Sequence, residues 1–151
     1  MTRVAAIDCG TNSIRLLVAD GHIDESGRPR LADLTRQMRI VRLGQGVDAR
    51  GYLDPAAIER TVEATVEYQR MIEALGATKT RFVATSATRD ASNSADFVRQ
   101  IKAVIGVEPE VVVGTEEASL SFNGAVSGLG ESVAAPMLVV DIGGGSTELV
   151  L

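Results

Sequence analysis

The sequence from residue 139 to residue 151 reads VVDIGGGSTELVL. Its two apolar runs predict two strands, and the three glycines predict the tight turn between them. Glycine has no Cβ, so such a turn can take φ > 0 and bring its N–H groups close to an anion, most often a phosphate. Asp141, at the end of the first strand, is placed to hold a cation such as Mg²⁺, which prefers one or two carboxylates together with phosphate oxygens. The stretch therefore predicts a phosphate–metal hairpin.

A second copy of this pattern lies near the N-terminus. Residues 7–18 read IDCGTNSIRLLV and align without a gap with residues 140–151. The alignment places Asp8 on Asp141, Gly10 on Gly143, Ser13 on Ser146 and Arg15 on Glu148. Two such hairpins predict a duplicated fold with a phosphate clamped between the copies. The alternative is a plain hairpin with a flexible glycine turn that recurs by chance, and the matching aspartate, glycine and serine favour duplication.

Composition limits the class of protein. The chain has 151 residues, 45% hydrophobic and 3% aromatic, which is enough to bury one aliphatic core. No apolar run is long enough to span a bilayer and no signal peptide is recognisable, so no membrane association is expected. The single cysteine, Cys9, excludes an internal disulfide and indicates a reducing, cytoplasmic location. A formal net charge of −5 argues against nucleic acid as a partner.

Strands and helices are expected to alternate along most of the chain. Strands are predicted over residues 3–9, 13–20, 31–43, 81–85 and 110–113. One helix is predicted from Pro55 to Leu75, capped by Asp54, ended by Gly76, and apolar at Ile58, Val62, Val66, Ile72 and Leu75. A second runs from a cap at Asn93 or Ser94 to Gly106, and a third from a cap at Thr115 to about residue 126. The segments 22–30 and 44–49 are predicted to be a loop and a turn, with His22 exposed.

This order predicts an α/β sheet with helices packed on it. The final hairpin then starts a second unit of the same kind, which divides the chain into residues 1–128 and 129–151. The alternative is one complete domain of 151 residues in which the final hairpin extends the sheet.

Four segments together resemble a known family. They are AIDCGTNS at 6–13, ATSATRDA at 84–91, GTEEA at 114–118, and residues 141–151. In this order they resemble the N-terminal part of the exopolyphosphatase and guanosine pentaphosphate phosphohydrolase family, within the actin, Hsp70 and sugar-kinase superfamily. The resemblance implies an actin-like (ribonuclease H-like) lobe with a mixed sheet and three helices. It also implies that the last hairpin opens a second, incomplete lobe, with the active site in the cleft between the lobes.

The resemblance also implies an activity. Family members release the terminal phosphate of inorganic polyphosphate or the 5′ γ-phosphate of guanosine pentaphosphate, with Mg²⁺. A glutamate pair in the first turn of a helix ordinarily complements the helix dipole, and from the residues alone Glu116 and Glu117 would do no more. The resemblance implies that Glu117 is the base that activates water, and it leaves Glu116 with the dipole role.

The site expected from these considerations has three parts. The expected catalytic residues are Glu117 and Glu148, and the expected Mg²⁺ ligands are Asp8, Asp141 and Glu148. The roles of Glu148, and that of Arg89 as a phosphate contact, are what the resemblance implies. The expected phosphate contacts are Gly10, Thr11, Asn12, Ser13, Arg89, Gly143, Gly144, Gly145, Ser146 and Thr147. The direction of the Arg15 side chain stays open, because it depends on the phase of its strand.

Two other functions and the assembly also stay open. The chain could be an ATP-binding member of the superfamily, such as a sugar kinase, or a truncated, non-catalytic phosphate-binding lobe. A homodimer is one assembly compatible with the sequence.

Overall fold

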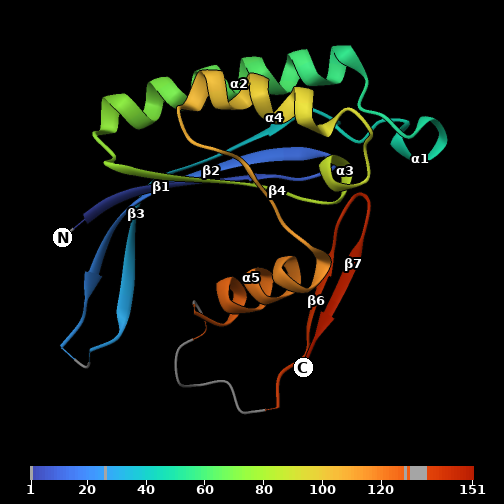
Figure 1. Ribbon diagram of the computed structural model, residues 1–151. Helices are drawn as coiled ribbons and strands as arrows, with labels where there is room; N and C mark the ends of the chain where they lie inside the picture. The colour runs from blue at the N-terminus through green and yellow to red at the C-terminus, as the bar shows by residue number, and fades with distance from the viewer. Residues whose placement is uncertain (1, 26, 128, 130–135) are drawn as a thin grey trace.

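The computed structural model describes residues 2–25, 27–127, 129 and 136–151. Five strands form one mixed sheet in the order β3-β2-β1-β4-β5 (Figure 1). Its strands are β1 (Thr2–Cys9), β2 (Ser13–Ile23), β3 (Pro29–Ile40), β4 (Lys79–Ala84) and β5 (Glu110–Val111). Strand β2 pairs antiparallel with both β1 and β3, whereas β4 runs parallel to β1 and β5 parallel to β4. The α/β class and the mixed sheet are as the sequence predicts.

The helices alternate with the later strands. They are α1 (Val47–Arg50), α2 (Pro55–Leu75), α3 (Ser86–Arg89), α4 (Ser94–Ile105) and α5 (Gly114–Ser127). The predicted ends of α2 are confirmed, because the Asp54 carboxylate accepts a hydrogen bond from the N–H of Ala56 at 2.9 Å and Gly76 closes the helix at φ 70. Gly76 thus supplies the left-handed residue that terminates many helices.

The core lies between one face of the sheet and the helices α2 and α4, which lie side by side over that face (Figure 1). Side chains alternate along a strand, so Ala5, Ile7 and Cys9 of β1 are buried under the helices and Asp8 points to the opposite face. Burial raises the pKa of the Cys9 thiol, as expected of a small core side chain without a reactive role. The face that carries Asp8 is left free for a site.

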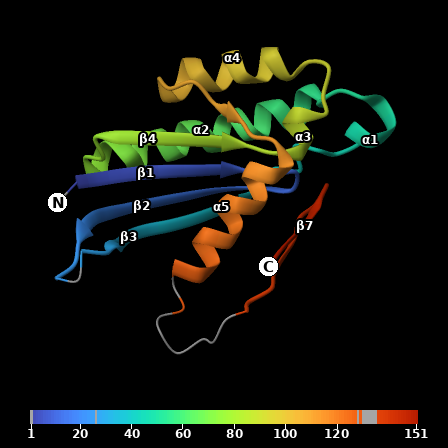
Figure 2. The ribbon, with the colours of Figure 1, turned by 60° about the horizontal axis from the view of Figure 1, so that its bottom comes forward.

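The final hairpin forms a sheet of its own. Strands β6 (Val139–Ile142) and β7 (Thr147–Val150) pair only with each other, so the alternative in which they extend the five-stranded sheet is wrong. Both strands contact α5, which crosses the face of the large sheet that lies away from α2 and α4 (Figure 2). The predicted boundary between 128 and 129 involves a residue outside the described part of the chain, and it stays a prediction.

Several local predictions are wrong. His22 is exposed but lies within β2, because β2 and β3 pair as far as Ile23 and Pro29 and leave a connection of only five residues. The predicted turn at 44–49 leads into the four-residue helix α1. Thr115 lies inside α5, which begins at Gly114, so it does not cap that helix.

Among the residues that the structure describes, none of the helices has both the length and the apolar character that a membrane span requires.

The predicted cap of the second helix is also corrected. Asn93 precedes α4 without capping it through its side chain. Instead its side-chain amide binds the backbone of Leu53, accepting from the N–H at 2.8 Å and donating to the carbonyl at 3.0 Å. Helix α5, which corresponds to the third predicted helix, has no buried residue. It contacts the final hairpin and adds no side chain to the core.

Candidate active site

The two hairpins are built alike. In the first, Asp8 lies opposite Arg15 and the N–H of Gly10 donates to the carbonyl of Ser13 at 3.0 Å. In the second, Asp141 lies opposite Glu148 and the N–H of Gly143 donates to the carbonyl of Ser146 at 2.9 Å. The four residues matched by the sequence alignment thus have the same strand partners or the same turn hydrogen bond in both hairpins, which confirms the internal repeat.

The glycines of the second turn do not take the backbone conformation expected from the sequence. Of the described glycines, those with positive φ are Gly27, Gly46, Gly51, Gly76 and Gly106, so the expectation of φ > 0 at residues 143–145 is wrong. Glycine is needed in this turn because the turn lies very close to other residues. A Cβ on Gly145 would lie 2.8 Å from Thr11 Oγ1 and 2.9 Å from Ser86 Oγ, distances too short for a carbon atom. The glycines let the second turn pack directly onto the first turn and onto α3.

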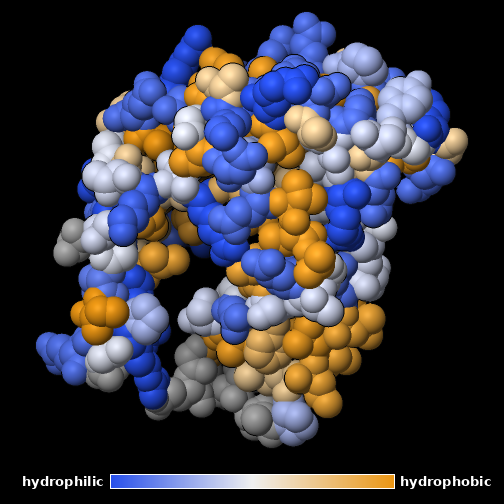
Figure 3. All heavy atoms as spheres, in the orientation of Figure 1, coloured by the Kyte–Doolittle hydropathy of each residue, from blue (hydrophilic) through white to orange (hydrophobic). Residues whose placement is uncertain are grey.

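A cleft of about 1130 Å³ opens between the two turns, the free face of the large sheet and α5. Figure 3 shows a hollow in this region, beneath the sheet and between the β2–β3 hairpin and α5. The first turn lines the cleft with Gly10 to Ser13, and the second with Gly143, Gly144 and Ser146. Within the described chain, the N–H groups of Thr11, Asn12, Gly144 and Gly145 have no hydrogen-bond partner. The turns therefore present unpaired donors beside a cavity, as anion binding requires.

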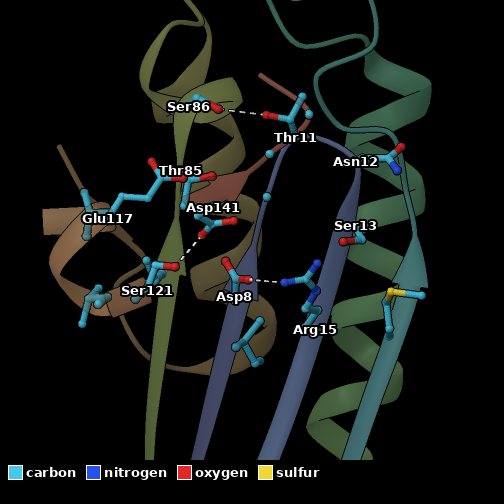
Figure 4. Close-up of a pocket in the computed structure, with 18 of the residues that line it drawn as sticks. Asp8, Thr11, Asn12, Ser13, Arg15, Thr85, Ser86, Glu117, Ser121 and Asp141 are labelled. Atoms are coloured by element: carbon cyan, nitrogen blue, oxygen red, sulfur yellow. Dashed lines mark hydrogen bonds and ion pairs between the residues drawn. The ribbon is translucent and has the colours of Figure 1, made fainter. Parts of the chain in front are cut away.

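Two aspartates, one from each hairpin, meet in the cleft (Figure 4). Burial raises the pKa of Asp8, nearby Arg15 lowers it, and the negative charge of Asp141 raises it again. Arg15 Nη1 lies 3.6 Å from Asp8 Oδ2, which shows that the Arg15 side chain faces the cleft. Asp141 Oδ2 accepts a hydrogen bond from Ser121 Oγ of α5 at 2.7 Å. The two carboxylates are thus held from opposite sides, by Arg15 and by Ser121.

Glu117 reaches the cleft from the first turn of α5, and its side chain is only 16% exposed. Its Oε2 accepts a hydrogen bond from Arg89 Nη1 at 3.3 Å. Burial raises the pKa of Glu117, the Arg89 hydrogen bond lowers it, and the charge of Glu148 raises it. Figure 4 shows the Glu117 side chain directed toward Thr85 at the end of β4. A half-buried carboxylate with a raised pKa beside a cavity fits a general base.

Glu116 occupies a different environment from its neighbour. It is exposed and accepts a hydrogen bond from Arg81 at 3.2 Å, and Arg81 is also bound to Glu110 at 2.6 Å. This ion-paired surface position agrees with the non-catalytic role expected for Glu116.

The cleft collects most of the expected site residues but leaves some at its margin. Glu117, Asp8 and Asp141 line it together with both turns, whereas Gly145, Thr147, Glu148 and Arg89 do not. Arg89 lies in the short helix α3, not in a loop, and its Nη1 donates to the carbonyl of Val112 at 2.8 Å. Four further residues that line the cleft belong to none of the quoted motifs and could not be predicted from the sequence: Arg36, Arg42, Leu120 and Ser121. Ser86 also lines the cleft and lies within the segment 84–91, but it was not among the expected site residues.

Of the three predicted Mg²⁺ ligands, only two are placed to share an ion. No three His, Cys, Asp or Glu side chains in the described chain are close enough together to enclose a metal, so Asp8, Asp141 and Glu148 do not form a complete ligand set. Asp8 and Asp141, which interact across the cleft, supply the one or two carboxylates that Mg²⁺ takes when phosphate oxygens and water complete its shell. Asp8 and Asp141 would hold the ion, with Glu148 beside Asp141 across the hairpin.

Similarity to known proteins extends over the whole chain. Exopolyphosphatase 2 of Mycobacterium tuberculosis is 53% identical over 156 residues, which cover 100% of this chain and 48% of that protein. The crystal structure of an exopolyphosphatase-like protein superposes with a TM-score of 0.89 at 48% identity, covering 98% of this chain and 44% of the other. The Ppx/GppA family member from Aquifex aeolicus gives a TM-score of 0.80 at 32% identity, covering 98% and 46%.

The chain therefore spans about half the length of the relatives it matches, and its two hairpins and α/β sheet have the actin-like fold of these structures. The model of the Ppx/GppA phosphatase family matches residues 21–151. On this match, and on the relatives that share its fold, the chain belongs to the Ppx/GppA phosphatase family.

Proposed function

We propose that this chain forms the phosphate-binding half of a Mg²⁺-dependent hydrolase that releases the terminal phosphate of inorganic polyphosphate. The observation that carries the proposal is one cleft that is lined both by residues of two equivalent turns with unpaired amides and by a half-buried glutamate, Glu117. Family membership supports hydrolysis of a phosphoanhydride, and relatives of more than 50% identity are named exopolyphosphatases.

Each group in the cleft has a role in this reaction. The amides of Thr11, Asn12 and Gly144 donate to the oxygens of the terminal phosphate and stabilise the charge that develops on them. Glu117, as a carboxylate, accepts a proton from the attacking water and orients it toward phosphorus. Mg²⁺, when bound, neutralises charge on the phosphoryl oxygens.

Arg89 and Glu148 act on Glu117 from two sides. Arg89 lowers the pKa of Glu117 and Glu148 raises it, so together they tune the base. For Arg89 to contact a phosphate oxygen directly, it would have to leave the carboxylate of Glu117 or bridge the two groups.

The lining of the cleft favours polyphosphate over a nucleotide such as guanosine pentaphosphate. Among the described residues no aromatic side chain lines it, so no platform for a base to stack on is present there. Guanosine pentaphosphate remains the second candidate substrate because the matched family is named after both Ppx and GppA phosphatases. A sugar-kinase-like activity would require ATP and an acceptor. A homodimer, the absence of nucleic-acid binding and a cytoplasmic location stay predictions of the sequence.

One assay separates these activities. Phosphate release is measured side by side on inorganic polyphosphate, guanosine pentaphosphate and ATP, with Mg²⁺ and with excess chelator, for the 151-residue chain and for the complete protein. Rapid release from polyphosphate by the complete protein, lost with chelator, is the expected result. Transfer of the γ-phosphate of ATP to an added sugar, with ADP formed and no free phosphate released, would indicate a kinase. An active 151-residue chain would show that this half carries the whole reaction.

A further inference from the structure

Four arginines line the cleft: Arg15, Arg36, Arg42 and Arg81. They come from three strands and from the segment after β3, so nothing in the linear sequence marks them as a cluster. Arg81 is bound by two carboxylates, those of Glu110 and Glu116, and Arg15 lies beside Asp8. Arg42 pairs with no carboxylate of the described chain, and Arg36 pairs only with Asp33 of its own strand, which does not line the cleft. Arg36 and Arg42 are therefore the two arginines that are not held by Asp8 or by two carboxylates at once.

Arg42 is held beside the first turn by its backbone. It has φ 50, and within the described chain it is the one residue other than glycine with a positive φ. Its N–H and that of Val41 both donate to the carbonyl of Asn12, at 2.9 and 3.0 Å, which fixes this conformation. A left-handed arginine is strained, and strain of this kind concentrates at functional sites.

The side chain of Arg42 is available as well as fixed in place. The residue is exposed, it lines the cleft, and no side chain or backbone group of the described chain forms a hydrogen bond or ion pair with its guanidinium. A glycine at position 42 would relieve the backbone strain, so the presence of arginine there indicates that the side chain itself is useful.

Arg36 lies further along the floor of the same cleft. On β3 it is two residues before Met38, so both side chains share one face of the sheet, and Met38 lies opposite Arg15 on β2. From the first turn toward the far end of the sheet, Arg15 is thus followed by Arg36. The ion pair of Arg36 with Asp33 is solvent-exposed, and such pairs are weak enough to exchange for a phosphate.

We propose that Arg36 and Arg42 bind the phosphate groups that follow the terminal one and so select a substrate with a chain of several phosphates. This inference rests on the proposed function, because it assumes that the terminal phosphate sits at the turns. A guanidinium forms two parallel hydrogen bonds with a phosphate, and a polyphosphate chain carries a negative charge on every unit. The floor of the cleft then provides the basic track that the overall charge of −5 does not suggest.

The test compares substrates of two lengths. In the complete protein, Arg42→Asn and Arg36→Gln are assayed with long-chain polyphosphate and with tripolyphosphate, and Arg70→Gln on α2, outside the cleft, is the matched control. Asparagine tolerates the left-handed backbone, so Arg42→Asn removes the charge without new strain. Arg36→Gln, further from the turns, is expected to raise KM for the long chain about tenfold and KM for tripolyphosphate about twofold or less. Arg42→Asn, beside the first turn, is expected to raise both KM values about tenfold, and neither variant should alter kcat. Arg42→Lys is expected to keep part of the affinity.

Binding of labelled long-chain polyphosphate, measured at several salt concentrations, gives a readout independent of turnover. Each removed arginine should reduce the slope of log K against log salt by about 0.7–1. The same KM and the same slope in the cleft variants and in Arg70→Gln would overturn the inference and leave the proposed function intact. An unsubstituted protein that releases no phosphate from any polyphosphate would refute the proposed function, and the binding data would still decide the role of the two arginines.

Discussion

Glu117 Oε2 lies 3.3 Å from Arg89 Nη1, and the same nitrogen donates to the carbonyl of Val112 at 2.8 Å. The contact joins two sequence motifs that lie 28 residues apart, one on α3 and one on α5. It means that the protonation of the expected base depends on the expected phosphate contact. Burial and Glu148 raise the pKa of Glu117, and Arg89 opposes them.

Removing Arg89 should therefore shift the pH dependence of hydrolysis. In Arg89→Gln the pKa of Glu117 loses the interactions that lower it, so it rises further. A base must be deprotonated to act, and activity is lost as pH falls through its pKa. The acid limb of log kcat/KM against pH should thus move to higher pH. Arg99→Gln, whose arginine pairs with Asp96 on α4, is the control. An acid limb that stays in place in Arg89→Gln would show that Glu117 does not control this step.

The packing of the two turns can be tested at Gly145. Gly145→Ala places a Cβ 2.8 Å from Thr11 Oγ1 and 2.9 Å from Ser86 Oγ, so this hydrogen-bonded pair of hydroxyls, or the two turns themselves, must shift. Because misplacement by about 1 Å can cost on the order of 10²-fold in rate, kcat should fall by about that factor. Gly124→Ala on α5 is the control, since a Cβ there meets nothing within 4 Å, and it should stabilise the helix by up to about 1 kcal/mol. Full activity in Gly145→Ala would contradict the close approach of the turns.

A buried hydrogen bond links the first hairpin to α2, on the face of the sheet opposite the cleft. The hydroxyl of Tyr68 on α2 donates to the carbonyl of Ile14 at 3.0 Å, and Tyr68 is fully buried. Tyr68→Phe leaves that carbonyl without this partner and should lower the free energy of unfolding by about 1–3 kcal/mol in urea denaturation. The exposed Tyr52→Phe should change it by less than about 0.5 kcal/mol. Equal stabilities of the two variants would rule out a structural role for this hydroxyl.

The hydrogen bond from Ser121 to Asp141 should matter for Mg²⁺, if the ion binds as proposed. Ser121→Ala removes the 2.7 Å contact that orients the Asp141 carboxylate. Loss of a group that orients a metal ligand typically weakens metal affinity by about 10–100-fold, so the Mg²⁺ concentration for half-maximal activity should rise toward that range. Direct Mg²⁺ titration by calorimetry should show the same loss. Ser119→Ala, on the same helix but outside the cleft, should leave both values unchanged.

The sequence predicts the elements of this fold well where local chemistry determines them. Asp54, Pro55 and Gly76 mark the ends of α2 because capping and backbone conformation are properties of a few neighbouring residues. The apolar face of α2 is predicted less well. Ile58 and Ile72 are buried as expected, but Thr61 and Thr65 are buried too, because each hydroxyl donates to a carbonyl one turn earlier at 2.8 Å. A hydropathy pattern does not record that compensation.

In the site, too, features set by neighbouring residues are predictable from the sequence and features set by packing are not. The repeat of aspartate, glycine and serine is visible in the sequence, and it correctly identifies two equivalent turns. The contacts between Glu117 and Arg89, and between Ser121 and Asp141, depend on how α5 crosses the sheet, which no local pattern specifies. Likewise, Arg36 and Arg42 reach the cleft only because β3 pairs with β2 and its end folds onto the first turn.

Paired substitutions test most directly whether Glu117 is the base that activates water. Glu117→Gln keeps the size of the side chain but removes the basic carboxylate, whereas Glu116→Gln alters its exposed neighbour. Because the folded-state pKa of Glu117 is raised, its ionisation lowers stability as pH rises through that pKa, so Glu117→Gln should not be less stable at neutral pH.

The measurement is the rate of phosphate release from polyphosphate by the complete protein carrying each substitution. We expect Glu117→Gln to lower kcat by on the order of 10²–10⁴ with polyphosphate binding retained, and Glu116→Gln to stay within about twofold of the unsubstituted protein. Equal, small losses in the two variants would contradict the assignment of Glu117 as the base and would transfer that role to Glu148.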